Sequence, residues 1–292
     1  MSTLKTARYH IIALFVVVVW GTTLVATKTL LNNGMSPRDI FFIRFLLAYV
    51  CIWFFEQRRL WANNLKDEFL FMLLGVTGGS LYFMLSNTAL EYTQASNAAL
   101  LGCTAPILTI FLSRLLLKDE KLSRYVWLGS ILAIVGVAFV VFNGQFALQV
   151  SPLGDVLVLL SALSWALYII LLKRLGNRYP TLFITRKVFF YGILTLLPLF
   201  LHTPLNINLG LLKTPVVLGS LLYLGIIASL CCFFLWNTAV KKLGAVRTGN
   251  YIYLSPLVTM VASVLIMNEV ITITALVGTV LILASVALAE RR

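Results

Sequence analysis

The side chains that could bind a solute are aromatic and hydroxyl groups placed at helical spacing inside apolar segments. Trp20 and Thr23 share one face of an early segment, and Trp165 and Tyr168 repeat that face in a later one. The uncharged cavity candidates are Trp20, Thr23, Tyr82, Asn97, Trp165, Tyr168, Trp236, Asn250 and Tyr253. Rings with a few amides and hydroxyls are typical of a pocket for a small amphipathic solute. The competing interpretation of each such residue is hydrogen bonding between packed helices.

Arg44 and Lys187 are the charged residues best placed to recognise a solute. Both fall inside apolar segments, at corresponding places in the two halves of the chain. Charge at membrane depth is costly, so such residues are functional candidates. Two cations, one near each opening, could attract a carboxylate or a phosphate. Because each lies close to a segment end, the alternative is that both side chains snorkel to the membrane surface.

The acidic residues and histidines give no sign of catalysis. All ten acids, from Asp39 to Glu290, map to loops or segment ends, and His10 and His202 are also terminal. The sequence holds no buried carboxylate pair and no serine with a plausible base, so it predicts no catalytic residue and no enzyme. The four cysteines lie in apolar runs without metal-type spacing, so no metal and no cofactor are expected.

Pro106 and Pro256 fall in the middle of two apolar segments. A proline inside a helix removes a backbone hydrogen bond and clashes with the preceding turn. In a membrane, the carbonyl that loses its partner must be satisfied by a neighbour or by water. Both prolines are therefore expected to face protein or a cavity, either as hinges or as static kinks.

The composition places these residues in a membrane protein. Of 292 residues, 60% are hydrophobic and only 11% are charged, whereas a soluble domain is about a quarter charged. The net charge of +13 does not indicate nucleic-acid binding, because the Lys and Arg residues lie in short gaps between apolar runs. In that position they orient a membrane protein.

About ten apolar runs are long enough to span a membrane as helices. They cover residues 10–31, 39–56, 68–90, 96–117, 123–142, 153–174, 181–201, 214–240, 248–267 and 272–289. With the N-terminus in the cytoplasm, Lys and Arg gather in the inside gaps, and only Arg38 and Lys213 fall outside. The sequence thus predicts an all-α, multi-pass membrane protein with ten transmembrane helices. Both termini should lie in the cytoplasm, in what is expected to be a bacterial inner (plasma) membrane.

The two halves of the chain resemble each other. Residues 85–89 match 235–239, Pro106 aligns with Pro256, and Trp20 aligns with Trp165. Residues 10–142 and 153–289 then form two five-helix repeats, and an odd number of spans inserts the second repeat upside down. Inverted repeats are typical of alternating-access transporters, with the site where the halves meet.

At these residues the sequence resembles the EamA type of the drug/metabolite transporter superfamily. The resemblance rests on Trp20-Gly21, on Arg44, on the run from Asn87 to Pro106, and on the second-half repetition that includes Pro256. It implies a ten-helix, proton-linked or facilitated exporter of amino acids, related metabolites or drugs. It also implies that spans 1, 3, 4, 6, 8 and 9 line a central cavity, while spans 5 and 10 lie at the periphery.

The predicted function is export of small metabolites, such as amino acids or related compounds, by alternating access. The runner-up is an organophosphate or nucleotide-sugar antiporter of the same superfamily, which Arg44 and Lys187 would suit. A channel is a weaker alternative, since no ring of charge and no repeated filter loop is present. The expected partners are a small-molecule substrate and the lipid bilayer, with no nucleic acid, and the oligomeric state stays open.

Overall fold

The computed structural model describes residues 3–55, 61–93, 95–117, 124–142, 151–202, 210–258, 261 and 273–289. The helices of the first part are α1 (Thr3–Asn32), α2 (Pro37–Trp53), α3 (Leu65–Gly75), α4 (Leu81–Tyr92), α5 (Ala95–Gly102), α6 (Ala105–Leu117) and α7 (Arg124–Phe142). Those of the second part are α8 (Pro152–Leu175), α9 (Thr181–His202), α10 (Pro215–Leu222), α11 (Cys232–Leu243), α12 (Ala245–Asn250) and α14 (Ile273–Ala289). Short 3-10 turns cover Leu211–Lys213 (η2) and Tyr251–Leu254 (η4).

Several of these helices have the length and composition of membrane spans. Five qualify within the described chain: Ala7–Asn32, Leu65–Tyr92, Pro152–Leu175, Thr181–Leu201 and Pro215–Leu243. Three shorter apolar helices cover Ala105–Leu117, Arg124–Phe139 and Leu276–Val286. No strand occurs in the described ranges. The expectation of an all-α membrane protein is therefore confirmed.

Two of the long helices each contain a π-helical segment. The segment η1 (Val76–Ser80) joins α3 to α4, and η3 (Tyr223–Cys231) joins α10 to α11. Their positions correspond in the alignment of the two halves, which pairs Gly75 with Gly225. A π segment shifts the backbone hydrogen-bond register and is often found at functional sites. Here each segment presents a backbone carbonyl to a neighbouring helix.

Those carbonyls accept hydrogen bonds from side chains of α1 and α8. The indole nitrogen of Trp20 donates to the Ala228 carbonyl of η3, with a nitrogen–oxygen distance of 2.9 Å. The Ser164 hydroxyl donates to the Thr77 carbonyl of η1, with an oxygen–oxygen distance of 2.8 Å. Because backbone polar groups in a membrane must be satisfied by protein, these bonds fix α1 against η3 and α8 against η1.

Glycines allow close helix contacts at the start of each π segment. A Cβ atom on Gly75 would lie 2.4 Å from Cβ of Tyr191 on α9, and one on Gly225 would lie 2.9 Å from Cβ of Leu47 on α2. Both distances are shorter than a real contact allows, so only glycine fits at these positions. The two crossings bring the first part of the chain into contact with the second.

One of the two prolines, Pro106, occupies a different place from the one expected. Helix α5 ends at Gly102 and α6 begins at Ala105, so Pro106 lies in the first turn of α6. Pro256 likewise follows η4, within a short helical stretch over 255–258. A proline is tolerated in a first turn, where its missing N–H would have no helical partner. For Pro106, the expected position inside one continuous helix is wrong, because the helix is already broken before the proline.

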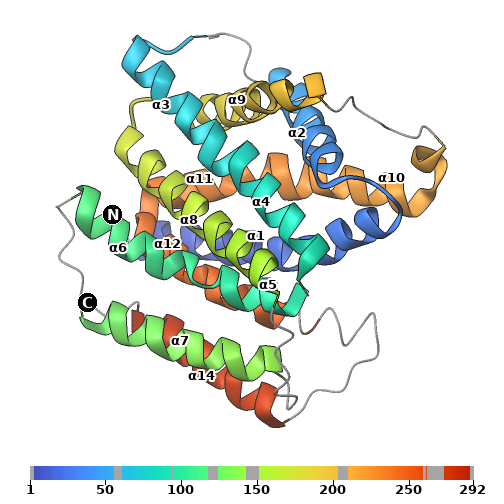
Figure 1. The fold of residues 1–292 in the computed structure, drawn as a ribbon. Helices are drawn as coiled ribbons and strands as arrows, with labels where there is room; N and C mark the ends of the chain where they lie inside the picture. Colours follow the sequence, from blue (N-terminus) through green and yellow to red (C-terminus); the bar gives the residue numbers. More distant parts are fainter. Residues whose placement is uncertain are drawn as a thin grey trace.

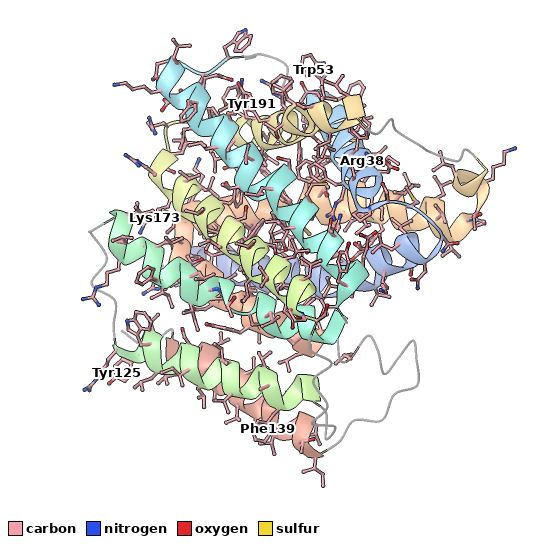
Figure 2. All side chains as sticks on the ribbon, viewed as in Figure 1. Arg38, Trp53, Tyr125, Phe139, Lys173 and Tyr191 are labelled. Carbon is pink, nitrogen blue, oxygen red and sulfur yellow. The ribbon has the colours of Figure 1, made fainter. Side chains whose placement is uncertain are left out.

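Helices α7 and α14 lie side by side at one edge of the molecule (Figure 1). Gly136 of α7 faces the backbone of Gly278 of α14, where a Cβ atom would lie 2.9 Å from the Gly278 oxygen. Large apolar side chains such as Phe139 remain exposed along this pair (Figure 2). Exposed apolar surface of this extent suits contact with lipid.

The glycine crossing yields a stability prediction. Gly75→Ala should lower the apparent melting temperature of the detergent-purified protein, because the new methyl group would displace Tyr191 and the backbone of Gly192. Overpacking of this kind costs about 1–3 kcal/mol. The matched control is Gly219→Ala, whose Cβ would meet nothing within 4 Å. Equal melting of the two variants would show that the close approach at Gly75 does not contribute to stability.

Candidate functional site

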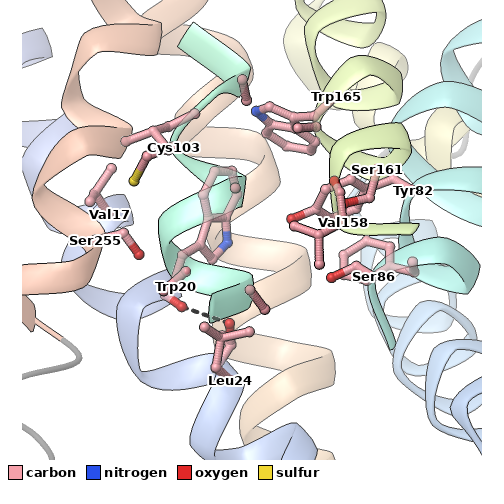
Figure 3. A pocket seen from close by; sticks show the side chains of 18 of the residues that line it. Val17, Trp20, Leu24, Tyr82, Ser86, Cys103, Val158, Ser161, Trp165 and Ser255 are labelled. Carbon is pink, nitrogen blue, oxygen red and sulfur yellow. Dashed lines mark hydrogen bonds between the residues drawn. The ribbon is translucent and has the colours of Figure 1, made fainter. Parts of the chain in front are cut away.

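A cavity of about 140 Å³ lies between the two parts of the chain. Its walls come from α1, α2, α4, α5, α6, α8, α11, η4 and the 255–258 stretch. Of the residues expected at a site, it is lined by Trp20, Thr23, Arg44, Tyr82 and Trp165. Figure 3 shows Trp165, Ser161 and Tyr82 on one side, with Trp20, Cys103 and Ser255 facing them. The helical-face pattern in the sequence thus indicates residues that the fold brings together.

The cavity wall is largely aromatic. The ring centroids of Trp20 and Trp165 lie 5.2 Å apart in an edge-to-face arrangement, and Tyr82 lies 5.1 Å from Trp165. Phe233 of α11 contacts both tryptophans, with centroids 5.9 Å from each. Edge-to-face pairs stabilise one another beyond simple burial, so the wall is preorganised. Sequence reasoning missed Phe233, because an apolar residue in an apolar span gives no contrast.

Hydroxyl groups give the cavity hydrogen-bond acceptors. Thr23 donates its hydroxyl to the Trp20 carbonyl, and Ser161 donates to the Val158 carbonyl, each at 2.7 Å between the oxygens. With their hydrogens used on their own helices, these oxygens retain lone pairs. They can therefore accept from an ammonium or hydroxyl group of a solute.

Arg44 supplies the positive charge of the cavity. Its side chain is 2% exposed, its Nε donates to the Ser229 hydroxyl at 2.9 Å, and its guanidinium lies 4.3 Å from the Phe83 ring centroid. The ion pairs within the described chain join other residues, and none includes Arg44. A buried cation without a counter-ion is costly, so a solute anion at this point gains a large interaction.

Lys187 does not line the cavity, in contrast to the sequence-based expectation. It forms an ion pair with Glu68 at the start of α3, and the Tyr191 hydroxyl donates to the same carboxylate. Its ammonium also lies 5.1 Å from the Trp61 ring centroid. The protein's own carboxylate thus neutralises Lys187. Arg44 and Lys187 occupy corresponding positions in the two halves, yet only Lys187 has an acidic partner within the described chain.

A second ion pair lies beside this one. Arg178, in the corner between α8 and α9, pairs with Asp67, whose other oxygen accepts from the Tyr179 hydroxyl at 2.8 Å. Burial, reinforced by Asp67, raises the pKa of Tyr179, so the phenol stays a donor at neutral pH. We call this group of Asp67, Glu68, Arg178, Tyr179, Lys187 and Tyr191 the α3–α9 clamp. It ties the start of α3 to the second part of the chain.

Four further expected site residues, Tyr168, Trp236, Asn250 and Tyr253, lie outside the cavity lining. Tyr168 donates to Asn237 at 2.5 Å, and Asn237 donates to Thr185 at 3.0 Å, so Tyr168 joins α8, α11 and α9. Tyr168 therefore fits the competing interpretation, in which a polar residue forms hydrogen bonds between packed helices. Trp236 is fully buried, 5.0 Å from the Trp20 ring.

Asn250 and Tyr253 are also buried, with 1% of each exposed, and neither lines the cavity. The Asn250 amide has no hydrogen-bond partner within the described chain. Asn97 belongs to α5, and its side chain lies outside the described residues.

Comparison with known proteins agrees with this architecture. The model of the EamA-like transporter family matches residues 7–142 and again residues 152–290. A solved crystal structure aligns with a TM-score of 0.76, over 97% of this chain and 96% of that chain. Its sequence identity is 17%, so this likeness shows the fold alone.

Relatives of similar length carry transporter names. An "uncharacterized transporter" of Archaeoglobus fulgidus is 27% identical over 97% of both chains. The transporters YyaM and YdfC of Bacillus subtilis are 29% and 27% identical. They cover 77% and 97% of this chain, and 74% and 90% of their own. With both parts of the chain matched by the family model, the protein belongs to the EamA-like transporter family.

Proposed function

We propose that this transporter exports small metabolites that carry a carboxylate, such as amino acids or related compounds, by alternating access. The observation that supports this most directly is Arg44, a buried cation without an acidic partner in the described chain, placed in an aromatic cavity. An arginine donates to a carboxylate through two parallel bonds, and the aromatic wall suits the apolar part of the solute. Thr23 and Ser161 would accept from its ammonium group.

The cavity size and charge disfavour the organophosphate or nucleotide-sugar alternative. A cavity of about 140 Å³ is close to the size that holds a single six-membered ring. Its described lining contains one cation, whereas a doubly charged phosphate would call for more. Lys187, the second cation on which that alternative depended, is occupied by Glu68.

The proposal includes ten spans arranged as two inverted repeats, 10–142 and 153–289. The corresponding π segments support it, because η1 accepts from α8 and η3 accepts from α1. The glycine crossings support it in the same way, since Gly75 meets α9 and Gly225 meets α2. These two pairs of contacts repeat with the roles of the halves exchanged, as a two-fold axis in the membrane plane requires.

The orientation predicted from the Lys and Arg residues suggests which side of the membrane this conformation faces. With both termini in the cytoplasm, the cavity-lining parts of α4, α5 and α8 lie in the outer half of the membrane. The α3–α9 clamp lies at the cytoplasmic end. We therefore propose that this is an outward-facing form, in which the clamp closes the inner end and must part when solute enters from the cytoplasm.

Removal of the Arg44 charge provides the first test of the proposed function. In reconstituted vesicles assayed with an amino-acid panel, with and without a pH gradient, Arg44→Gln should weaken transport of zwitterions. The loss should be on the order of 10- to 100-fold, the value of a charge-assisted hydrogen bond. Transport of amide analogues, which lack the carboxylate, should change little in this variant.

Ser229→Ala is the matched control for Arg44. It removes the bond to Nε and keeps the charge, so its effect on zwitterion transport should be smaller. Equal losses for carboxylates and amides in Arg44→Gln would assign the residue to folding or gating.

The tryptophan pair provides a second test. Trp20→Ala and Trp165→Ala should each reduce transport sharply, because the two rings form the cavity wall, while the phenylalanine variants should keep partial activity. Binding of a transported solute should change tryptophan fluorescence in the purified protein. Trp127→Ala on α7, away from the cavity, is the control. Normal transport by both folded alanine variants would place the binding site elsewhere.

A further inference from the structure

A second, basic cavity lies outside the transport site, where the corner between α8 and α9 meets the end of α11. Its volume is about 400 Å³, and its lining includes Asn177, Arg178, Thr181, Thr238, Lys241 and Lys242. No carboxylate is among its described lining residues. Three cations contributed by two separate elements therefore face one cavity that holds no acidic side chain of its own.

The cations are positioned in a way that leaves donors available. The Lys241 ammonium donates to the Tyr179 carbonyl at 2.8 Å, which fixes this side chain across the cavity wall. Arg178 uses Nε on the Leu175 carbonyl and Nη1 on Asp67, so Nη2 has no partner within the described chain. Lys242 is exposed and belongs to none of the ion pairs of that chain.

The backbone adds to this charge. Helix α9 begins at Thr181, on the cavity wall, and the first N–H groups of a helix carry partial positive charge. The Thr181 hydroxyl contributes a donor at the same place, whereas the Thr238 hydroxyl on the opposite wall already donates to the Phe234 carbonyl of its own helix. Ammonium, guanidinium and hydroxyl donors around a helix N-terminus form the donor set that phosphate oxygens accept from.

The level of the cavity relative to the membrane indicates which kind of molecule would present the phosphate. Three apolar spans have their ends there: Pro152–Leu175 and Pro215–Leu243 finish at the cavity, and Thr181–Leu201 starts from it. The cavity thus lies at the level where a bilayer presents its headgroups, and basic pockets between helices on the cytoplasmic side suit anionic headgroups. We propose that this cavity binds the phosphate group of an anionic phospholipid.

Occupancy would act on the α3–α9 clamp through Arg178. A phosphate bound at Nη2 leaves the pair between Arg178 and Asp67 intact. It would hold the corner between α8 and α9 in place and so favour the clamped form. The lipid would then regulate the clamped form and would bind at a site separate from that of the transported solute.

The test uses the full-length protein and needs no transport assay. Purified protein is placed in nanodiscs of phosphatidylcholine with or without phosphatidylglycerol, and in detergent with inorganic phosphate against chloride at equal ionic strength. Melting temperature and lipid retained in native mass spectrometry are recorded. Phosphatidylglycerol should raise the melting temperature. Lys241→Gln/Lys242→Gln should reduce its retention on the order of tenfold or more.

The control variant Arg114→Gln/Arg124→Gln removes two positive charges from α6 and α7, neither of which contributes to the cavity lining, and should behave as the parent does. If inorganic phosphate raised the melting temperature as much as phosphatidylglycerol does, the cavity would still be a phosphate site, and its occupant would be free phosphate. Equal lipid retention by the cavity variant and the control variant would overturn the proposal, because attraction would then follow total charge alone.

Discussion

The structure depends on two side-chain hydrogen bonds to backbone carbonyls of the π segments, one in each half of the chain. Polar backbone groups within a membrane bond to protein, so a bond of this kind holds two spans together. Trp20 donates to the Ala228 carbonyl of η3, and Ser164 donates to the Thr77 carbonyl of η1. Each bond fixes a cavity-lining helix against the other half of the chain. The Trp20 ring, held by its own N–H, then forms the wall against which Trp165 and Phe233 pack. Helix packing and the shape of the cavity therefore have one common origin.

The two halves share a plan and differ in charge. Arg44 and Lys187 hold corresponding positions, yet Arg44 has only the Ser229 hydroxyl and the Phe83 ring beside it, while Lys187 has the Glu68 carboxylate. In the alignment that pairs Gly75 with Gly225, Glu68 corresponds to Leu218, so the position that pairs with Lys187 in one half has an apolar counterpart in the other. Under the proposed function, this single difference leaves Arg44 for a solute and commits Lys187 to the clamp. One half would then provide the binding residue and the other the residue that closes the inner end.

Periodicity in the sequence predicts the aromatic site, since Trp20, Thr23 and Trp165 need only helical spacing to share a face. It does not predict Phe233 or Cys103, because apolar residues in apolar spans carry no signal. The pairing of Glu68 with Lys187 joins residues far apart in the chain, and an acid at a segment end is easily taken as solvated. Ser229 looks like part of a small-residue packing seam until its contact with Arg44 is seen. The break before Pro106 was missed because the apolar pattern runs through it unchanged.

In the proposed outward-facing form, the cavity opens to the outside while the clamp closes the inside, and labelling of Cys103 on the cavity wall can test this. A variant that keeps Cys103 and replaces Cys51, Cys231 and Cys232 with alanine can be treated with a membrane-impermeant methanethiosulfonate. The reagent should label Cys103 from outside in intact cells, and a transported solute should slow the labelling. Labelling only from the cytoplasmic side, in inverted vesicles, or labelling that no transported solute slows, would contradict it.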